Sequence, residues 1–493
     1  MSKYLAAIDQ GTSGTRCIIF DKKGRIISSS YIKHRQITPH PGWVEQDPLE
    51  IIRNVKFVLK DAIRKSKVKE KDIVLGVTNQ RETIVGWDKN SGKPVYNAIV
   101  WQDSRTYKTI EYLRDNGFDD EIWKKTGLHP STYFSATKIK WLIDNTDRIK
   151  DKLSRGDILF GNMDTWIIWN LTNEHKFITD TTNASRTMLM NLKKLDWDDD
   201  ILEIFNIPRD SLPLISKSIR FDDEIKFDDI EVHSEIGDQQ ASLLGSLGFD
   251  VGDLEVTYGT GSFLLQNIGV KPRLNRKGLI TTCAYSIGKS CVYAYEGSNA
   301  ISGQLLAWLH DNINLISSFD EAEEILKKNL NKDRSVYFVP AFSGLFAPYW
   351  DQSARGMIIG LTENTKKDDI LLSVFDAMCY QIRDIVELMG PRDINKIIVG
   401  GGPTENSSLM QLQANILGIK IIKSRIKEMT AFGAAIAAGL GAGEFNSIDE
   451  LKRINIADKE FLPSSDKNKW NANYRNWLKA IEKSRGWIGL GNN

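Results

Sequence analysis

The sequence predicts an α/β protein made of two related domains that face one another across a cleft. The chain has 493 residues, too many for one compact domain at about 150 residues each. Strand-like and helix-like patterns are mixed along it, which favours α/β layering. The same strand–turn–strand pattern also recurs near the start of each half. We therefore expect one domain over residues 1–249 and a second over residues 250–493.

In the first half, "YLAAIDQGTSGTRCIIF" (residues 4–20) has two apolar runs around a turn rich in Gly, Thr and Ser. This pattern predicts a hairpin. Residues 47–66 have apolar residues at helical spacing, with Asp47 as the cap and Pro48 in the first position of a helix. "DIVLGVTNQRETIVGWD" (72–88) predicts a buried strand that ends in a polar turn.

The second half repeats the opening hairpin. "LEVTYGTGSFLLQNIG" (254–269) again reads as a strand, a Gly/Thr/Ser turn and a strand. The small residues of 430–443 predict a helix that packs closely on a sheet. Residues 468–484 place Trp470, Tyr474 and Trp477 on one helical face, which predicts a docking helix with an aromatic core stripe.

Composition excludes several classes of protein. Lys plus Arg is 65 and Asp plus Glu is 64, so nothing points to nucleic acid or an acidic membrane as the main partner. The four cysteines form no CxxC motif, and sparse cysteines fit a reducing compartment. Neither a signal peptide nor an apolar run long enough for a membrane span is present. We expect a soluble cytoplasmic protein.

Three glycine-rich turns, at residues 11–15, 259–262 and 400–402, are candidate phosphate sites. Glycine lets backbone amides approach a phosphate because no Cβ intervenes. The chain lacks a P-loop, a dinucleotide fingerprint and the protein-kinase signature set. Each turn alone fits a plain hairpin better than a phosphate site, but three in one chain favour a nucleotide.

Several polar residues have both a structural and a functional interpretation. Asp9 could cap its turn or hold Mg²⁺ against phosphate oxygens. Asp238 could cap a helix or act as a general base on a hydroxyl. Arg81 and Glu82 could form a surface ion pair, or both could face a ligand if the chain turns there. Trp101 could close a core at a strand end or form a pocket wall.

With these elements in order, the chain resembles the FGGY carbohydrate kinases over essentially its whole length. The resemblance implies an actin-like, ribonuclease-H-like fold in which two ATPase domains flank a catalytic cleft. The N-terminal domain would carry the polyol site and the first phosphate turn, and the C-terminal domain would bind the nucleotide. The matching stretches include "AIDQGTSGTR", "GVTNQRET", "NAIVWQDSR", "TDTTNASRTML", "GDQQASLLG", "TYGTGSFLL" and "VPAFSGLFAPYWD".

The resemblance also implies roles for individual residues. Asp238 would be the catalytic base, and Asp9 would be associated with Mg²⁺. The implied polyol contacts are Arg81, Glu82, Trp101, Tyr133, Asp238, Gln239 and Phe263, with Trp101 and Phe263 as opposite walls. The implied ATP contacts are Thr12, Ser13, Gly14, Arg16, Thr260, Gly303, Gly402 and Asn406.

The activity implied is ATP-dependent phosphorylation of glycerol to sn-glycerol 3-phosphate with release of ADP, the first step of glycerol catabolism. A homodimer or higher homo-oligomer is expected. Two alternatives stay open: a kinase of the same family for another polyol or a ketose, and an actin-like ATPase that serves as a binding or assembly module. By the same resemblance, Ala307 stands where many family members have a glutamine, and Pro403 stands where a small residue is usual. These departures leave the nucleotide preference open.

Overall fold

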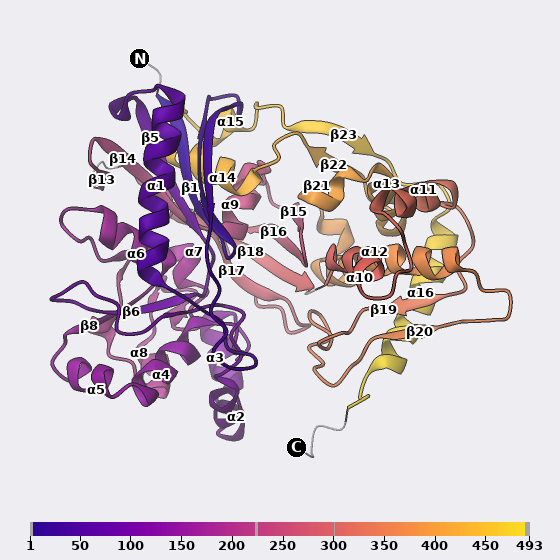
Figure 1. The fold of residues 1–493 in the computed structure, drawn as a ribbon, viewed down its shortest axis with the longest axis horizontal. Helices are drawn as coiled ribbons and strands as arrows, with labels where there is room; N and C mark the ends of the chain where they lie inside the picture. The colour runs from indigo at the N-terminus through magenta and orange to yellow at the C-terminus, as the bar shows by residue number, and fades with distance from the viewer. Residues whose placement is uncertain (1–2, 222–224, 300, 489–493) are drawn as a thin grey trace.

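Two large mixed sheets form the framework of the protein, the first in the indigo-to-magenta part of Figure 1 and the second in the pink-to-yellow part. The computed structural model describes residues 3–221, 225–299 and 301–488. Within these residues, no helix combines the length and hydropathy needed to cross a bilayer.

The first sheet has the strand order β13-β14-β5-β1-β2-β3. Strands β1, β2 and β3 form an antiparallel meander, while β5 and β14 extend the sheet in parallel with β1. Its strands are β1 (Tyr4–Gln10), β2 (Gly14–Phe20), β3 (Ile26–Lys33), β5 (Ile73–Asn79), β13 (Lys226–Phe227) and β14 (Ile230–Gly237).

The second sheet has the order β17-β18-β16-β15-β21-β22-β23. Strands β15 and β16 form an antiparallel hairpin, and β21 and β22 continue the sheet in parallel with β15. Its strands are β15 (Asp253–Tyr258), β16 (Ser262–Gly269), β17 (Ile280–Ile287), β18 (Ser290–Asn299), β21 (Lys396–Gly400), β22 (Ile421–Ser424) and β23 (Ala457–Phe461).

The predicted hairpins therefore occupy equivalent places in the two sheets, each followed by two parallel strands. One difference is that β18, rather than the next strand along the chain, pairs with β16. The predicted α/β fold with two related units is confirmed. The division at residues 249 and 250 stays a prediction.

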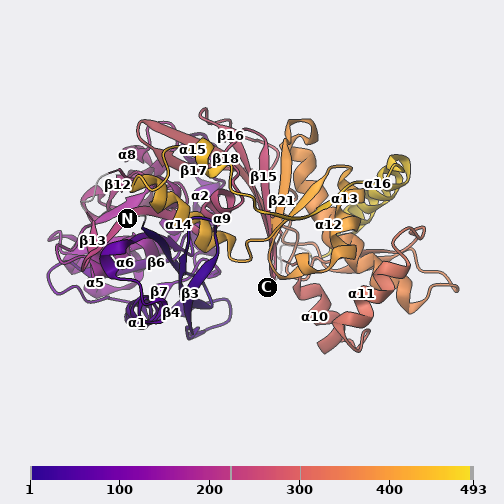
Figure 2. The ribbon, with the colours of Figure 1, turned by 90° about the horizontal axis from the view of Figure 1, so that it is seen from above.

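Helices α9 (Asp238–Gly245) and α14 (Met429–Gly441) tie the two sheets together. Helix α14 comes late in the chain, yet it packs on β1, β5 and β14 of the first sheet, as both ribbon views show (Figures 1 and 2). Helix α9 packs on α14 and also contacts β15, β16 and β17 of the second sheet. Their contact is backbone to backbone, since a Cβ on Gly433 would lie 1.7 Å from the carbonyl oxygen of Ala241. The close packing predicted for residues 430–443 is therefore present, on a helix as well as on the sheet.

The two other helices predicted from periodicity are confirmed. Helix α1 runs over Pro48–Ser66, and the Asp47 side chain accepts the amide of Leu49. Helix α16 covers Lys467–Ser484 and buries its aromatic stripe in the core of the second half. Two of the stripe residues, Tyr474 and Trp477, donate to Asp384 of α12 (Lys367–Met389) at 2.7 and 3.0 Å.

Smaller elements complete the fold. A four-stranded sheet has the order β4-β7-β6-β8, and its strands are β4 (Glu45–Gln46), β6 (Ile84–Asp88), β7 (Ala98–Ile99) and β8 (Ile158–Asn162). The short pairs are β9 (Ile178–Asp180) with β12 (Leu214–Ser216), β10 (Met190–Asn191) with β11 (Asp196–Trp197), and β19 (Tyr337–Val339) with β20 (Met357–Ile359). The other α-helices are α2 (Tyr107–Asp115), α3 (Asp119–Thr126), α4 (Ser135–Asn145), α5 (Asp147–Leu153), α6 (Met163–Leu171), α7 (Thr181–Ala184), α8 (Asp199–Phe205), α10 (Gln304–Asp311), α11 (Phe319–Lys328), α12 (Lys367–Met389), α13 (Ser407–Leu417) and α15 (Ile448–Leu451).

Candidate active site

The turn between β5 and β6 buries two opposite charges. Arg81 and Glu82 are 2% and 1% exposed, so they are not the surface ion pair that was one interpretation of the sequence. The chain turns sharply here, because the amide of Thr83 donates to the carbonyl of Arg81 at 2.7 Å and Glu82 has φ +62°. This turn lets neighbouring side chains serve one site, which adjacent residues of a straight strand cannot do.

Asp238 lies next to Arg81 at the start of α9. Its Oδ1 is 3.1 Å from Nε of Arg81 and accepts the amide of Gln239 at 2.7 Å. The cap position of α9 belongs to Gly237, and that cap involves no side-chain hydrogen bond. The carboxylate is therefore not the helix cap that the sequence allowed. With its side chain 27% exposed, it is open to a ligand.

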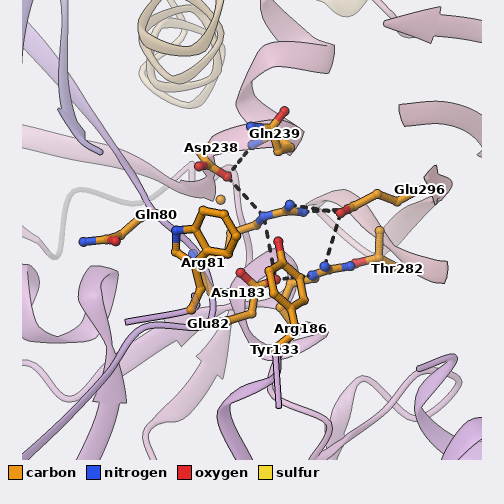
Figure 3. A network of polar contacts seen from close by, with 12 residues as sticks. Gln80, Arg81, Glu82, Tyr133, Asn183, Arg186, Asp238, Gln239, Thr282 and Glu296 are labelled. Carbon is orange, nitrogen blue, oxygen red and sulfur yellow. Dashed lines mark hydrogen bonds and ion pairs between the residues drawn. The ribbon is translucent and has the colours of Figure 1, made fainter. Parts of the chain in front are cut away.

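Behind this pair lies a buried ring of four alternating charges, drawn in Figure 3. Glu296 of β18 accepts from both terminal nitrogens of Arg81, at 2.6 and 3.0 Å. Arg186 lies 3.2 Å from Glu296 and donates to Glu82 at 2.6 Å. Arg81 and Glu82 close the ring at 3.9 Å. Two arginines and two glutamates balance in charge, which is the condition for burying them.

Aromatic rings and an amide border the same region. The rings of Trp101 and Tyr133 meet edge to face with centroids 5.5 Å apart, and the Trp101 indole donates to the Thr12 hydroxyl at 2.9 Å. The side-chain oxygen of Gln239 is buried and has no hydrogen-bond partner among the described residues. Such an orphaned acceptor costs free energy unless a ligand or water satisfies it.

Phe263 belongs to the second sheet. It lies half-buried on β16, between Thr257 of β15 and Ser298 of β18. Within the described chain, the ring in contact with Trp101 is that of Tyr133. The role of Phe263 as the wall opposite Trp101 stays a prediction.

Burial governs proton affinity in the cluster. It raises the pKa of the Asp238 carboxyl to about 7; Arg81 opposes this shift and Glu82 adds to it. Burial also opposes the ionisation of Glu296, but Arg186 and Arg81 outweigh it and lower the pKa of that carboxyl. At neutral pH, Glu296 is therefore ionised while Asp238 is poised to exchange a proton. A group with a pKa near the working pH suits general base catalysis.

The first phosphate turn joins β1 and β2. Thr12 and Ser13 lie at its solvent-accessible tip, and a Cβ on Gly14 would lie 2.6 Å from the carbonyl oxygen of Ile32. Arg16 lies between two carboxylates, 3.5 Å from Asp9 and in an ion pair with Glu428.

The other predicted nucleotide residues converge at the edge of the second sheet. The amide of Gly303 donates to the carbonyl of Gly259 at 3.0 Å, and that of Ser302 donates to Thr260 at 2.7 Å. A Cβ on Gly303 would lie 3.2 Å from the ring of Pro403, so the turns after β15, β18 and β21 meet. Gly402 borders open space.

Asn406 caps a helix here, because its side chain accepts the amide of Leu409 of α13 at 2.8 Å. The start of α14 links the two groups of turns. Glu428 pairs with Arg16 of the first turn, while a Cβ on Gly400 of the last turn would meet the Met429 side chain at 2.3 Å.

No group of three or more His, Cys, Asp or Glu side chains suited to a metal occurs in the described part of the chain. Asp9 fits a different arrangement, in which one carboxylate supports a cation carried mainly by phosphate oxygens. It is 9% exposed at the end of β1, and burial raises its pKa to about 6 while Arg16 opposes that shift.

The sequence interpretation missed Arg186, Glu296 and Gln240. Arg186 lies in "TTNASRTML", a stretch that was matched but given no role. Glu296 is an isolated carboxylate in the apolar strand β18, and a charge inside such a strand was the available signal. Gln240 comes directly after the predicted contacts Asp238 and Gln239, and its side-chain oxygen accepts a hydrogen bond from Arg81 at 3.1 Å.

Comparison with known proteins accounts for nearly the whole chain. Residues 4–245 match the N-terminal domain of the FGGY family of carbohydrate kinases, and residues 254–442 match its C-terminal domain. The chain is 45% identical to the glycerol kinase of Roseiflexus sp., over 99% of this chain and 100% of that protein. It is 44% identical to glycerol kinase 2 of Thermotoga maritima, over 98% and 99%. The crystal structure of Plasmodium falciparum glycerol kinase with ADP superposes with a TM-score of 0.92 at 37% identity, covering 99% of both chains.

Proposed function

The chain belongs to the FGGY family of carbohydrate kinases, and from that premise we propose that it transfers the γ-phosphoryl group of ATP to glycerol. The products are sn-glycerol 3-phosphate and ADP. Full-length relatives that are glycerol kinases, at 44–46% identity, support this choice of acceptor.

One observation in the site carries the proposal. An exchangeable carboxyl, Asp238, lies 3.1 Å from a buried arginine, and the next residue, Gln239, has a buried side-chain oxygen without a partner among the described residues. Donors and acceptors for hydroxyl groups are therefore combined with a carboxylate that can take a proton from one of them. The Trp101 and Tyr133 rings supply an apolar border for the carbon chain.

In the mechanism, Asp238 accepts the proton of the terminal hydroxyl as its oxygen attacks the γ-phosphorus. The new bond joins that oxygen to phosphorus, and the bond from the γ-phosphorus to the bridging oxygen of ADP breaks. Arg81 and Gln239 hold the acceptor in line. Phosphoryl transfer depends mainly on such positioning and on charge stabilisation.

ATP would lie against the glycine-rich turns of both halves. Thr12, Ser13, Gly14 and Arg16 would contact it from the first turn, and Thr260, Gly303, Gly402 and Asn406 from the second half. Mg²⁺, held by Asp9 with the phosphates, would offset their negative charge. We further propose that the enzyme is cytoplasmic. We also propose that it works as a homodimer or larger assembly, and sedimentation of the purified protein would test this oligomeric state.

The decisive experiment compares acceptors at fixed Mg-ATP. Among glycerol, dihydroxyacetone, xylulose, erythritol and gluconate, glycerol should give the highest kcat/KM and dihydroxyacetone weak turnover. If xylulose, erythritol or gluconate matched glycerol, the enzyme would be a kinase for a larger sugar. ATP turnover that is independent of any acceptor would instead support an actin-like ATPase module.

A further inference from the structure

Glu296 contacts Arg81 on the side away from Asp238 (Figure 3). It comes from β18 in the second sheet, whereas Arg81 and Asp238 follow strands of the first sheet. Strand β18 pairs on both sides, with β16 and β17, so the backbone that carries Glu296 is fixed. We propose that Glu296 is a positioning residue for phosphoryl transfer, which orients the Arg81 guanidinium toward Asp238 and the acceptor and takes up its charge. This inference rests on the proposed function.

The hydrogen bonds of Arg81 show how the orientation is set. Glu296 accepts one from Nη1 and one from Nη2, and Gln240 accepts a further one from Nη1 at 3.1 Å. The donors left are Nε–H and one hydrogen on Nη2. Nε lies 3.1 Å from Asp238, so this remaining edge faces the reacting groups. A bidentate carboxylate fixes the plane of a guanidinium as well as its place.

Glu296 also fixes the second arginine of the ring. Its Oε1 lies 3.2 Å from Arg186, which in turn donates to Glu82 at 2.6 Å. The carboxylate therefore separates two buried guanidinium groups that would otherwise repel each other. Because Glu296 holds one end of the Arg186 guanidinium, the other end stays in contact with Glu82, a predicted hydroxyl-binding residue.

The charge of Glu296 bears on Asp238 through Arg81. The charged groups that face Asp238 are Arg81 and Glu82 from the β5–β6 turn and Asp9 from the end of β1. Of these, Arg81 is the cation, and its charge is already shared with Glu296. Without that carboxylate, Arg81 would stabilise ionised Asp238 more strongly, and the pKa of Asp238 would fall. An opposite charge at such a distance can lower a pKa by about 1 unit or more.

The test uses Glu296→Gln in the full-length enzyme, with kcat and kcat/KM for glycerol measured across pH at saturating Mg-ATP. We expect kcat/KM to fall about 10- to 100-fold, the effect of a misplaced catalytic geometry. The acid limb of the profile should move about 1 unit toward lower pH. Mg-ATP titrates identically in every assay, so a difference between the profiles belongs to the protein.

Two further variants separate positioning from folding. Glu296→Asp keeps the charge but shortens the arm, so its acid limb should stay with the wild type while kcat/KM falls. Asp253→Asn is the matched control, since Asp253 is a buried carboxylate of the same sheet that lies 3.1 Å from the cation of Lys396. Its acid limb should coincide with that of the wild type.

Either of two results overturns the proposal: an unmoved acid limb in Glu296→Gln, or wild-type kcat/KM in folded Glu296→Asp. If Glu296→Gln fails to fold, Glu296→Asp decides alone: at an unchanged melting temperature, lowered kcat/KM supports the role and unchanged kcat/KM refutes it. A wild-type enzyme without glycerol-dependent turnover would instead refute the proposed function, before any variant is compared.

Discussion

The polyol side and the nucleotide side of the site are built by different means. On the polyol side, charged side chains are buried and hold one another at 2.6–3.2 Å, as in the contacts of Arg81, Arg186 and Glu296. On the nucleotide side, the turns expose backbone instead of charged side chains. Gly259 and Gly402 are exposed, and Gly303 is half-buried.

Selectivity for the acceptor should reside on the polyol side. Side chains that are fixed by a buried ion network can discriminate among hydroxyl patterns, because a mismatch leaves a polar group unpaired. Backbone amides respond only to the charge and shape of the phosphate groups. The amino acid at a turn position therefore matters chiefly where a Cβ would collide with the phosphates or the fold. Mutations should therefore change acceptor use on one side and nucleotide affinity on the other.

The largest effect should come from removing a hydroxyl from the acceptor. Propane-1,2-diol and propane-1,3-diol should have kcat/KM values about 10⁴-fold below that of glycerol, because the site then keeps an unpaired polar group such as Gln239. Initial rates with each alcohol at fixed Mg-ATP measure this. Diol rates within tenfold of the glycerol rate would mean that the polyol side is no more selective than the nucleotide side.

The next effect concerns the base. Asp238→Asn should lower kcat by about 10²–10⁴-fold, because asparagine keeps the shape but cannot accept the proton. Glycerol binding, measured by calorimetry, should persist. Asp384→Asn serves as the control. Asp384 is a buried carboxyl of α12 that accepts hydrogen bonds from Tyr474 and Trp477 of α16, so its replacement should not remove the catalytic base. Near-normal turnover in Asp238→Asn would assign the proton to another acceptor.

On the nucleotide side, two adjacent glycines should respond differently. Gly402 borders open space, so Gly402→Ala should fold normally and raise the KM for ATP about tenfold, roughly the loss of one charge-assisted hydrogen bond. Gly401 has φ +97°, and its Cβ would lie 1.9 Å from the carbonyl oxygen of Tyr258. Gly401→Ala should therefore lower the melting temperature.

These two variants are compared by thermal melts and by KM for ATP and for glycerol. The KM for glycerol should stay unchanged in Gly402→Ala. If that variant altered acceptor affinity as much as ATP affinity, the separation of the two sides would be wrong.

The smallest effect is expected from Ala307→Gln. Ala307 is half-buried on α10, just after Gly303, and a glutamine there would restore the amide of the family pattern. One added neutral hydrogen bond should lower the KM for ATP by about 2- to 5-fold. Ala307→Leu, of similar bulk but without an amide, is the control. An equal gain in the leucine variant would point to packing instead.

Local pattern was enough to predict several elements of the two large sheets and the helices around them. The hairpins, α1 with its Asp47 cap, and the aromatic stripe of α16 are confirmed because each depends on residues close together in the chain. The family match over residues 4–245 and 254–442 confirms the two-domain kinase fold.

The site shows where such prediction ends. Motifs led to Arg81, Glu82 and Asp238, and the structure brings these three together. The motifs did not point to Glu296, which is 215 residues from its partner Arg81 along the chain. They also gave no reason to pair Arg186 with Glu82, 104 residues away.

Local sequence patterns predicted the two hairpin turns, the buried strand after residue 72 and the candidate residues Arg81, Glu82 and Asp238. Those properties follow from side-chain polarity, glycine and short-range spacing, all of which are read over a few residues. Only the tertiary structure decided that β18 of the second sheet delivers a carboxylate to an arginine of the first. Such a pairing depends on how two sheets pack through α9 and α14, and electrostatic partners are chosen by distance in space rather than along the chain.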